Sequence, residues 1–157
     1  MAAEEKSFSN SAMEAVVQMW ERQKVKSPVY SFMLRDVVIT HAEPGLFKAR
    51  IKASEEHMNS HNGLHGVFSA CVTDWSGGLA IATHGWQSTG VSVDIHVTYL
   101  STAKIGDMLE IEATADRVGR NLAFTSVNVW KIDGDEKKLV AKGTHTKYVA
   151  NAVRPIA

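Results

Sequence analysis

Cysteine is nearly absent from this sequence, because Cys71 is the only one among 157 residues. An internal disulfide is therefore excluded, and a reducing compartment is expected. Net charge is absent too: 17 basic residues balance 17 acidic ones, so no global attraction to nucleic acid or to a membrane surface is indicated. No apolar run approaches the roughly 20 residues that a membrane-spanning helix needs, so membrane insertion is not expected.

The first ten residues, MAAEEKSFSN, also lack the features of a targeting segment. They contain no apolar core like that of a secretory signal, and their two acids do not suit an Arg-rich mitochondrial presequence. We expect a cytoplasmic protein, with a processed mitochondrial one as the alternative. A hydrophobic fraction of 45% and a charged fraction of 22% are typical of one globular domain, expected to cover residues 1–157.

The chain begins with a predicted helix and hairpin. Ser11 followed by Glu14 is a capping-box pattern, and the apolar residues after it recur at helical spacing, so a helix is expected over residues 11–24. Two strand-like runs then flank a turn at residues 43–45. The predicted strands cover residues 30–41 and 46–53.

A second helix is predicted over residues 66–84, after the polar and flexible stretch NSHNGLHG. It is apolar on most sides, which is typical of a buried helix. Its two internal glycines, Gly77 and Gly78, should each weaken it by about 1 kcal/mol relative to alanine. Paired glycines of this kind indicate that another backbone comes close.

The rest of the chain has the pattern of β-structure. Residues 91–99 alternate between apolar and polar side chains, which is the period of a half-buried strand. Three further strands are expected over residues 109–115, 122–132 and 139–149. A four-strand meander of this kind predicts an α+β fold with one antiparallel sheet curled around the central helix.

One acid, Asp74, interrupts the apolar helix. A carboxylate loses hydration there, which is costly unless it faces solvent, pairs with a cation or performs chemistry. A partly desolvated carboxylate can act as a general base on water or attack directly as a nucleophile. At the start of the same helix, Gly66 can offer an unpaired backbone N–H to a carbonyl oxygen as negative charge develops on it.

Asp74 and Gly66 are eight residues apart, so about 12 Å separates them along one helix. A base and an oxyanion donor that act on one carbonyl must both lie within about 3 Å of the reacting atoms. One copy of the helix cannot supply both groups, but two antiparallel copies can. If both residues are catalytic, the protein is at least a homodimer with two equivalent sites.

The pattern Asn59-x5-His65-Gly66-x7-Asp74, followed by Gly90-Val91-Ser92-Val93-Asp94, resembles the hot-dog fold acyl-CoA thioesterases. The similarity is greatest to the thioesterase superfamily member 2 branch (acyl-CoA thioesterase 13) and to the phenylacetate-pathway thioesterases. It extends over about residues 30–149. The resemblance implies a hot-dog fold, in which an antiparallel sheet wraps around a long helix. It also implies an enzyme that hydrolyses a fatty or aryl acyl-CoA to free acid and coenzyme A.

The resemblance also implies roles for individual residues. Asp74 would be the general base or nucleophile, and the Gly66 N–H would polarise the thioester carbonyl. Asn59 would help to place the carbonyl or the water, Ser92 would orient the water, and His65 would shape the loop and contact the thioester region. Coenzyme A would lie along the sheet and dimer edge, against Tyr99, Arg117, Val118, Gly119, Arg120, Asn121, Leu122 and Tyr148.

No metal or cofactor is implied, because coenzyme A is part of the substrate. The expected assembly is a homodimer or a homotetramer. Arg117 and Arg120 are suited to clamping phosphates, although a solvated turn explains them equally well. The sequence departs from the family pattern at Val67, where a second glycine is usual. Trp75, next to the acid, is a further candidate for changing which acyl group fits.

Other motifs in the chain carry weaker hypotheses. A zinc site could use three histidines spaced four apart, but Asn62-Gly63 does not suit a helix there. Residues 90–94 resemble a nucleophile elbow only superficially, because Asp94 replaces its second glycine. Cys71 is interpreted as a packing residue. The three histidines are His57, His61 and His65.

Two other functions would fit a hot-dog fold. A hydratase or dehydratase acting on a 3-hydroxyacyl thioester needs a histidine–carboxylate pair, and the sequence reveals no histidine paired with Asp74. A non-catalytic protein that binds acyl-CoA or lipid is the second alternative. Thiol release from acyl-CoA that disappears in Asp74→Ala would favour the thioesterase over both.

Overall fold

Six antiparallel strands form a single sheet in the computed structural model, which describes residues 2–155 and the side chains of residues 11–155. The strands are β1 (Val38–Glu43), β2 (Leu46–Lys52), β3 (Val91–Tyr99), β4 (Met108–Val118), β5 (Leu122–Asp133) and β6 (Glu136–Tyr148). Their order across the sheet is β1-β2-β4-β5-β6-β3.

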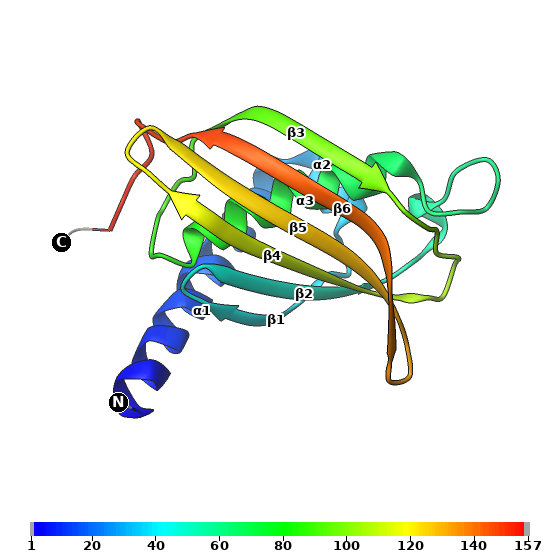
Figure 1. Cartoon of the computed structure of the whole chain (residues 1–157), viewed down its shortest axis with the longest axis horizontal. Coiled ribbons are helices and arrows are strands. Elements are labelled where there is room, and N and C mark those ends of the chain that lie inside the picture. The colour runs from blue at the N-terminus through cyan, green and yellow to red at the C-terminus, as the bar shows by residue number, and fades with distance from the viewer. Residues whose placement is uncertain (1, 156–157) are drawn as a thin grey trace.

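Three α-helices, α1 (Ala2–Lys26), α2 (Pro28–Met33) and α3 (Gly66–Ala82), lie on one face of this sheet (Figure 1). A short 3₁₀ helix, η1 (Glu55–His57), precedes the loop that leads into α3. Almost every side chain of α3 from Phe68 onward is buried against the sheet. The predicted α+β fold, an antiparallel sheet around a buried central helix, is therefore confirmed.

The apolar face of β2 shows why the sheet closes over α3. Phe47, Ala49 and Ile51 alternate with polar residues and are all buried, as the period of two predicted. Leu109 and Ile111 of β4 continue the same buried layer, because they pair with Ile51 and Ala49. The core therefore lies between the inner face of the sheet and the apolar sides of α3 and α1.

The predicted first strand is wrong over residues 30–37. Helix α2 occupies Pro28–Met33, and the strand begins only at Val38. Ser27 caps this helix, since its Oγ accepts a hydrogen bond from the backbone N–H of Tyr30 at 3.3 Å, and Pro28 supplies a backbone suited to the first helical turn. The cap and the proline outweigh the β-propensity of the valine, tyrosine and phenylalanine around them.

The predicted four-strand meander is also wrong in its first strand. Only β4, β5 and β6 follow one another across the sheet, whereas β3 pairs with β6 and forms the sheet edge. The connection after Tyr99 crosses to the middle of the sheet, where Ala53 donates its backbone N–H to Asp107 O at 2.8 Å. Strand order depends on this long-range contact, and the alternation within each strand carries no information about it.

Gly77 and Gly78 do mark a close approach, but not to another backbone. A Cβ added at Gly77 would lie 2.6 Å from Thr125 Oγ1 and 3.1 Å from His145 Nδ1, and one at Gly78 would lie 3.3 Å from Thr89 Oγ1. The neighbouring atoms are side chains of the same chain. Gly77 therefore lets α3 pack tightly onto β5 and β6, and Gly78 lets it pack against the segment that enters β3.

Candidate active site

Asp74 is the point on α3 where three other segments of the chain converge. Its side chain is 35% exposed. The Tyr30 hydroxyl of α2 donates a hydrogen bond to Oδ2 at 2.6 Å, and the Ser92 hydroxyl of β3 donates to Oδ1 at 3.2 Å. Nε2 of His145 on β6 lies 3.6 Å from the same Oδ1. The carboxylate is thus held by hydrogen bonds and still open to solvent, as a general base must be.

His145 is buried and neutral. Burial, together with the nearby Lys147 charge, lowers the pKa of His145 to about 4 despite the opposing influence of Asp74. Its Nε2 lies 2.9 Å from Ser92 Oγ. Because the Ser92 hydroxyl donates its hydrogen bond to Asp74, the serine oxygen is the acceptor toward His145, and Nε2 is the nitrogen that carries the hydrogen and donates. The result is a chain of hydrogen bonds from histidine through serine to the carboxylate.

The sequence reveals no histidine paired with Asp74, but the structure places His145 beside it. His145 is 71 residues from Asp74 along the chain and reaches it because β6 lies beside β3. Its position in β6, opposite Ile95 of β3, turns the ring toward α3. This histidine lies within the region of resemblance, but no signal in the sequence links it to the acid.

Tyr30 was missed altogether. It was placed in a predicted strand, whereas the first turn of α2 directs its hydroxyl to Asp74, 44 residues away in the sequence. Burial, and then the hydrogen bond to Asp74, raise the pKa of Tyr30 far above its ordinary value, so the phenol remains a donor at neutral pH. The signal that could have found it is the Ser27-Pro28 helix start.

Ser92 reaches Asp74 because of an irregularity in β3. Ser92 pairs with Lys147, and the next pair is Asp94 with Thr146, so Val93 is an extra residue in the strand. Such a β-bulge changes the direction in which neighbouring side chains point. Ser92 and Tyr99 consequently both contact α3, which strict alternation would not allow for residues seven positions apart.

The start of α3 provides the second half of the candidate site. His65 caps the helix, since its Nδ1 accepts the backbone N–H of Val67 at 3.0 Å and its carbonyl accepts that of Phe68. The N–H of Gly66 makes no hydrogen bond within residues 2–155. Tyr99 packs directly on Gly66: its hydroxyl donates to Gly66 O at 3.1 Å, and an added Cβ would lie 3.1 Å from its ring. Glycine thus lets Tyr99 pack closely against the helix start, while the Gly66 N–H keeps no partner among the described residues.

Val67, which replaces the second glycine of the family pattern, is 56% exposed. Its side chain is therefore not part of the core packing of α3. Trp75 behaves differently from the expectation that it shapes the acyl pocket. It is buried in the core, in edge-to-face contact with Trp20 and Phe47 at centroid distances of 5.3 and 5.2 Å.

Asn59 organises the loop before α3. Its Oδ1 accepts the backbone N–H groups of His61 and Gly63, at 2.9 and 3.2 Å, so this oxygen is occupied. Among the described side chains and backbone, its amide nitrogen makes no hydrogen bond. That nitrogen is the atom of Asn59 able to donate to a bound carbonyl or water.

The predicted catalytic residues, together with the contacting residues that the structure adds, thus form two groups within one chain. We call Tyr30, Asp74, Ser92 and His145 the acid cluster, and Asn59, His65, Gly66 and Tyr99 the amide cluster. They lie at opposite ends of β3, because Ser92 is near its start and Tyr99 is its last residue. No hydrogen bond joins the two clusters within the part of the chain that the structure describes.

The residues expected to bind coenzyme A are divided in the same way. Tyr148 pairs with Val91 and Leu122, which places it at the acid-cluster end of β3, while Tyr99 belongs to the amide cluster. Arg117 and Arg120 make no ion pair within residues 11–155. They line a cavity of about 290 Å³ with Gly119, Asn121, Leu122 and Phe124. Val118, in contrast, packs against a small apolar cluster that includes Ile81 and Trp86.

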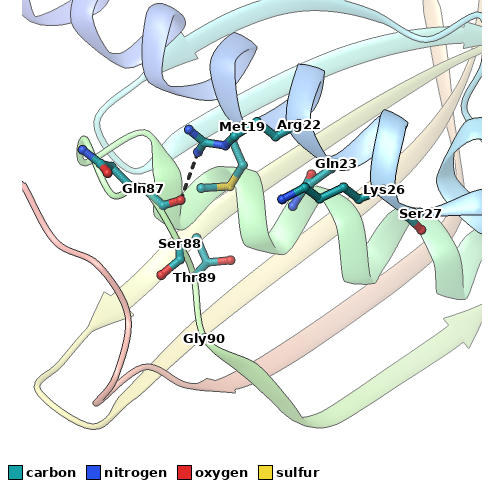
Figure 2. Close-up of a pocket in the computed structure, with 9 residues that line it drawn as sticks. All are labelled: Met19, Arg22, Gln23, Lys26, Ser27, Gln87, Ser88, Thr89 and Gly90. Carbon is teal, nitrogen blue, oxygen red and sulfur yellow. Dashed lines mark hydrogen bonds between the residues drawn. The ribbon is translucent and has the colours of Figure 1, made fainter.

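A second cavity, of about 360 Å³, lies between α1 and the segment that enters β3 (Figure 2). Two of its lining residues are close in sequence to the acid cluster, since Ser27 caps the helix of Tyr30 and Gly90 is two residues before Ser92. Arg22 spans one side and donates to Gln87 O at 3.0 Å. The lining consists of Met19, Arg22, Gln23, Lys26, Ser27, Gln87, Ser88, Thr89 and Gly90.

Other candidate sites find no support in the structure. No group of three or more His, Cys, Asp or Glu side chains in the described residues is placed to hold a metal ion. His57 is buried and its Nε2 lies 2.8 Å from Met33 O, so its ring joins the segment before α3 to the end of α2. Burial raises the pKa of the Cys71 thiol to about 12, which agrees with a packing role. Among the described helices, none has the length and apolarity to cross a membrane.

Comparison with known proteins finds relatives that cover most of this chain. The family model of the thioesterase superfamily matches residues 61–138. Human acyl-coenzyme A thioesterase 13 is 34% identical over 92% of this chain and 99% of its own length. The crystal structure of zebrafish thioesterase superfamily member 2 is 36% identical, covers 81% of this chain and 91% of its own, and superposes with a TM-score of 0.71.

The mouse thioesterase superfamily member 2 structure gives the same result, with 33% identity, coverage of 85% of this chain and 96% of its own, and a TM-score of 0.73. The α3 start and its acid both lie inside the matched family region, whereas Tyr30 and His145 lie outside it. Sequence, fold and relatives agree that this chain belongs to the thioesterase superfamily and is a hydrolase with the hot-dog fold.

Proposed function

We propose that the protein hydrolyses acyl-CoA thioesters, and that each active site combines the acid cluster of one subunit with the amide cluster of a second copy. The observation that carries this proposal is the division of the candidate residues between the two ends of β3. The name of the human relative, acyl-coenzyme A thioesterase 13, supports the substrate class.

The exposed edge of the sheet supports the shared site. β3 is the last strand of the sheet, and its apolar side chains are exposed: Val91 is 64% and Tyr99 is 58% accessible. An open edge with apolar side chains favours pairing with another strand. If two β3 strands pair antiparallel about a two-fold axis, the Val91 end of one meets the Tyr99 end of the other, which brings opposite clusters together.

In the proposed reaction Asp74 takes a proton from a water molecule that Ser92 orients, and the water oxygen attacks the thioester carbonyl carbon. The N–H of Gly66 in the second copy stabilises the resulting oxyanion, since it has no partner of its own. The carbonyl then reforms, the C–S bond breaks, and the coenzyme A thiolate takes the proton held by Asp74. The products are a free acid and coenzyme A.

Coenzyme A is expected along the cavity at residues 117–124. Arg117 and Arg120 carry positive charge without an ion-pair partner among the described side chains, which suits phosphate binding. The acyl group is expected in the second cavity, which has lining residues close in sequence to the acid cluster. Two cations and no acid line that cavity, so we expect short or polar acyl groups there rather than long alkyl chains.

A hydratase or dehydratase is the second candidate, because His145 does pair with Asp74. That chemistry requires the histidine to exchange protons with the substrate. The His145 side chain is fully buried and its Nε2 faces Ser92. Its position therefore favours a role in holding the serine, and hydrolysis remains the better supported reaction.

The proposal is tested by incubating the protein with acetyl-, hexanoyl-, palmitoyl-, phenylacetyl- and glutaryl-CoA in the presence of a thiol reagent. Hydrolysis should fall by about 10²–10⁴-fold in Asp74→Asn, because the base is lost. Ser92→Ala should cost less, since it removes positioning only. Near-parental turnover in Asp74→Asn would contradict the reaction, and tight binding without thiol release would favour a binding protein.

Mixed dimers test whether the site is shared. Gly66→Pro removes the N–H at a helix position that tolerates proline, so homodimers of this variant and of Asp74→Ala should both be inactive. A mixed dimer retains one intact site, so random mixing should restore about a quarter of the parental activity. No recovery in verified mixed dimers would argue that each subunit acts alone.

A further inference from the structure

We infer that Tyr30 is a positioning residue for hydrolysis: it fixes Oδ2 of Asp74, so that Oδ1 stays directed at Ser92 and the attacking water. The inference rests on the proposed reaction at Asp74. It concerns a residue outside the region matched by the family model, on a helix that precedes it.

The contact has the geometry of a strong hydrogen bond. Tyr30 Oη lies 2.6 Å from Asp74 Oδ2, which is the short distance typical of an O–H donor facing a carboxylate. Ser92 Oγ, at 3.2 Å, makes a longer bond to the other oxygen. The two oxygens therefore differ: one is tightly held by the phenol, and the other faces the serine and the open side of the site.

Helix α2 holds the phenol rigidly. Ser27 caps the helix at Tyr30 N, and Tyr30 O accepts the backbone N–H of Leu34 at 2.9 Å. The C-terminal end of α2 is also fixed, because Met33 and Leu34 are buried and Met33 O lies 2.8 Å from the buried His57 ring. A donor fixed at both ends of its helical segment restricts rotation of the carboxylate it bonds.

The bond from Tyr30 limits how the carboxylate of Asp74 can turn. Rotation would break this short bond and leave a partly buried phenol without its acceptor, which is unfavourable. Oδ1 therefore stays directed at Ser92, where the proposed reaction places the water.

The titratable groups around Asp74 are Tyr30 from α2, Cys71 on α3, and His145 and Lys147 from β6. The phenol and the thiol are protonated at neutral pH and His145 is neutral. Tyr30 and Ser92 are therefore the neutral hydroxyl donors that hold Asp74, and the bond from the tyrosine is the shorter of the two.

The test compares Tyr30→Phe with Phe32→Leu, which changes an exposed residue of the same helix that lines neither cavity. Phenylalanine keeps the ring and removes only the hydroxyl. We expect kcat to fall by about 10–100-fold with little change in KM. Phe32→Leu should match the parent in kcat and in KM.

A parental kcat in Tyr30→Phe would overturn the inference. If Asp74→Asn is inactive while Tyr30→Phe is unchanged, only the role of Tyr30 fails; if Asp74→Asn is active, the proposed reaction itself fails. Repeated turnover in ¹⁸O-labelled water tests the proposed reaction independently. Label should enter the free acid and not Asp74, and labelled Asp74 in the digested protein would contradict activation of water by Asp74.

Discussion

Replacing Gly77 by alanine should destabilise the fold, whereas the same change at its neighbour Gly78 should be neutral or stabilising. Both residues lie in the interior of α3, where alanine is favoured over glycine by about 1 kcal/mol. The difference comes from their surroundings. The new methyl group would meet a fixed side chain at one position and ordinary, slightly tight packing at the other.

The distances give the sign and size of each effect. At Gly78 the added Cβ lies 3.3 Å from Thr89 Oγ1, which needs only a small shift, so a gain of up to about 1 kcal/mol is expected. At Gly77 it lies 2.6 Å from Thr125 Oγ1, which is buried and bonded to His145 O at 3.1 Å. Overpacking of this kind costs about 1–3 kcal/mol, so the net loss should reach about 2 kcal/mol.

Urea or thermal unfolding at one protein concentration measures both variants, since assembly would otherwise shift the transition. For a chain of this length, each 1 kcal/mol corresponds to about 2–4 °C in Tm. Thr125→Ala removes the clashing oxygen and should make Gly77→Ala cheaper by about 1 kcal/mol in a double-mutant cycle. Equal stability of the two glycine variants, or an unchanged cost in the Thr125→Ala background, would refute the reasoning.

Three further predictions follow from the structure. The pKa of His145 falls from 6.5 in the unfolded chain to about 4 in the folded protein. The stability that this shift contributes should therefore be fully present above pH 6.5 and decrease toward pH 4, by at most about 3 kcal/mol. Urea unfolding at several pH values measures this decrease, and His145→Asn should flatten the pH dependence. Arg117→Gln with Arg120→Gln should raise KM for acyl-CoA about tenfold but leave acyl-pantetheine, which lacks the nucleotide phosphates, unaffected in the same thiol assay. Gly90→Ala should lower the free energy of unfolding by at least about 2 kcal/mol, because φ is +69° and the new Cβ would overlap a β6 carbonyl. Gly106→Ala, at φ +93° with nothing within 4 Å of the new Cβ, should lower it by only about 1 kcal/mol. Thermal unfolding measures both variants.

Local patterns were sufficient for much of the fold. The central helix was expected over residues 66–84 and is observed over Gly66–Ala82, because an apolar run between a glycine-rich loop and a polar segment has few other ways to bury its surface. The lone acid within that run was visible for the same reason. Its identification as a candidate base needed no tertiary information.

The partners of that acid could not be predicted in this way. Tyr30 and His145 lie 44 and 71 residues from Asp74, and no local period links positions so far apart. The bulge at Val93 could not be predicted either, because it depends on how β3 pairs with β6. Alternation placed Ser92 on the opposite face from Tyr99, and only the pairing of β3 with β6 reveals the extra residue that reverses this.

The amino-acid sequence by itself determined most of the secondary elements, the buried central helix and the two residues, Gly66 and Asp74, that cannot meet within one chain. These follow from spacing and hydrophobicity, which act over a few residues. Only the tertiary structure decided that the acid is held by a phenol, a serine and a neutral histidine, because those contacts depend on strand order and register across the sheet.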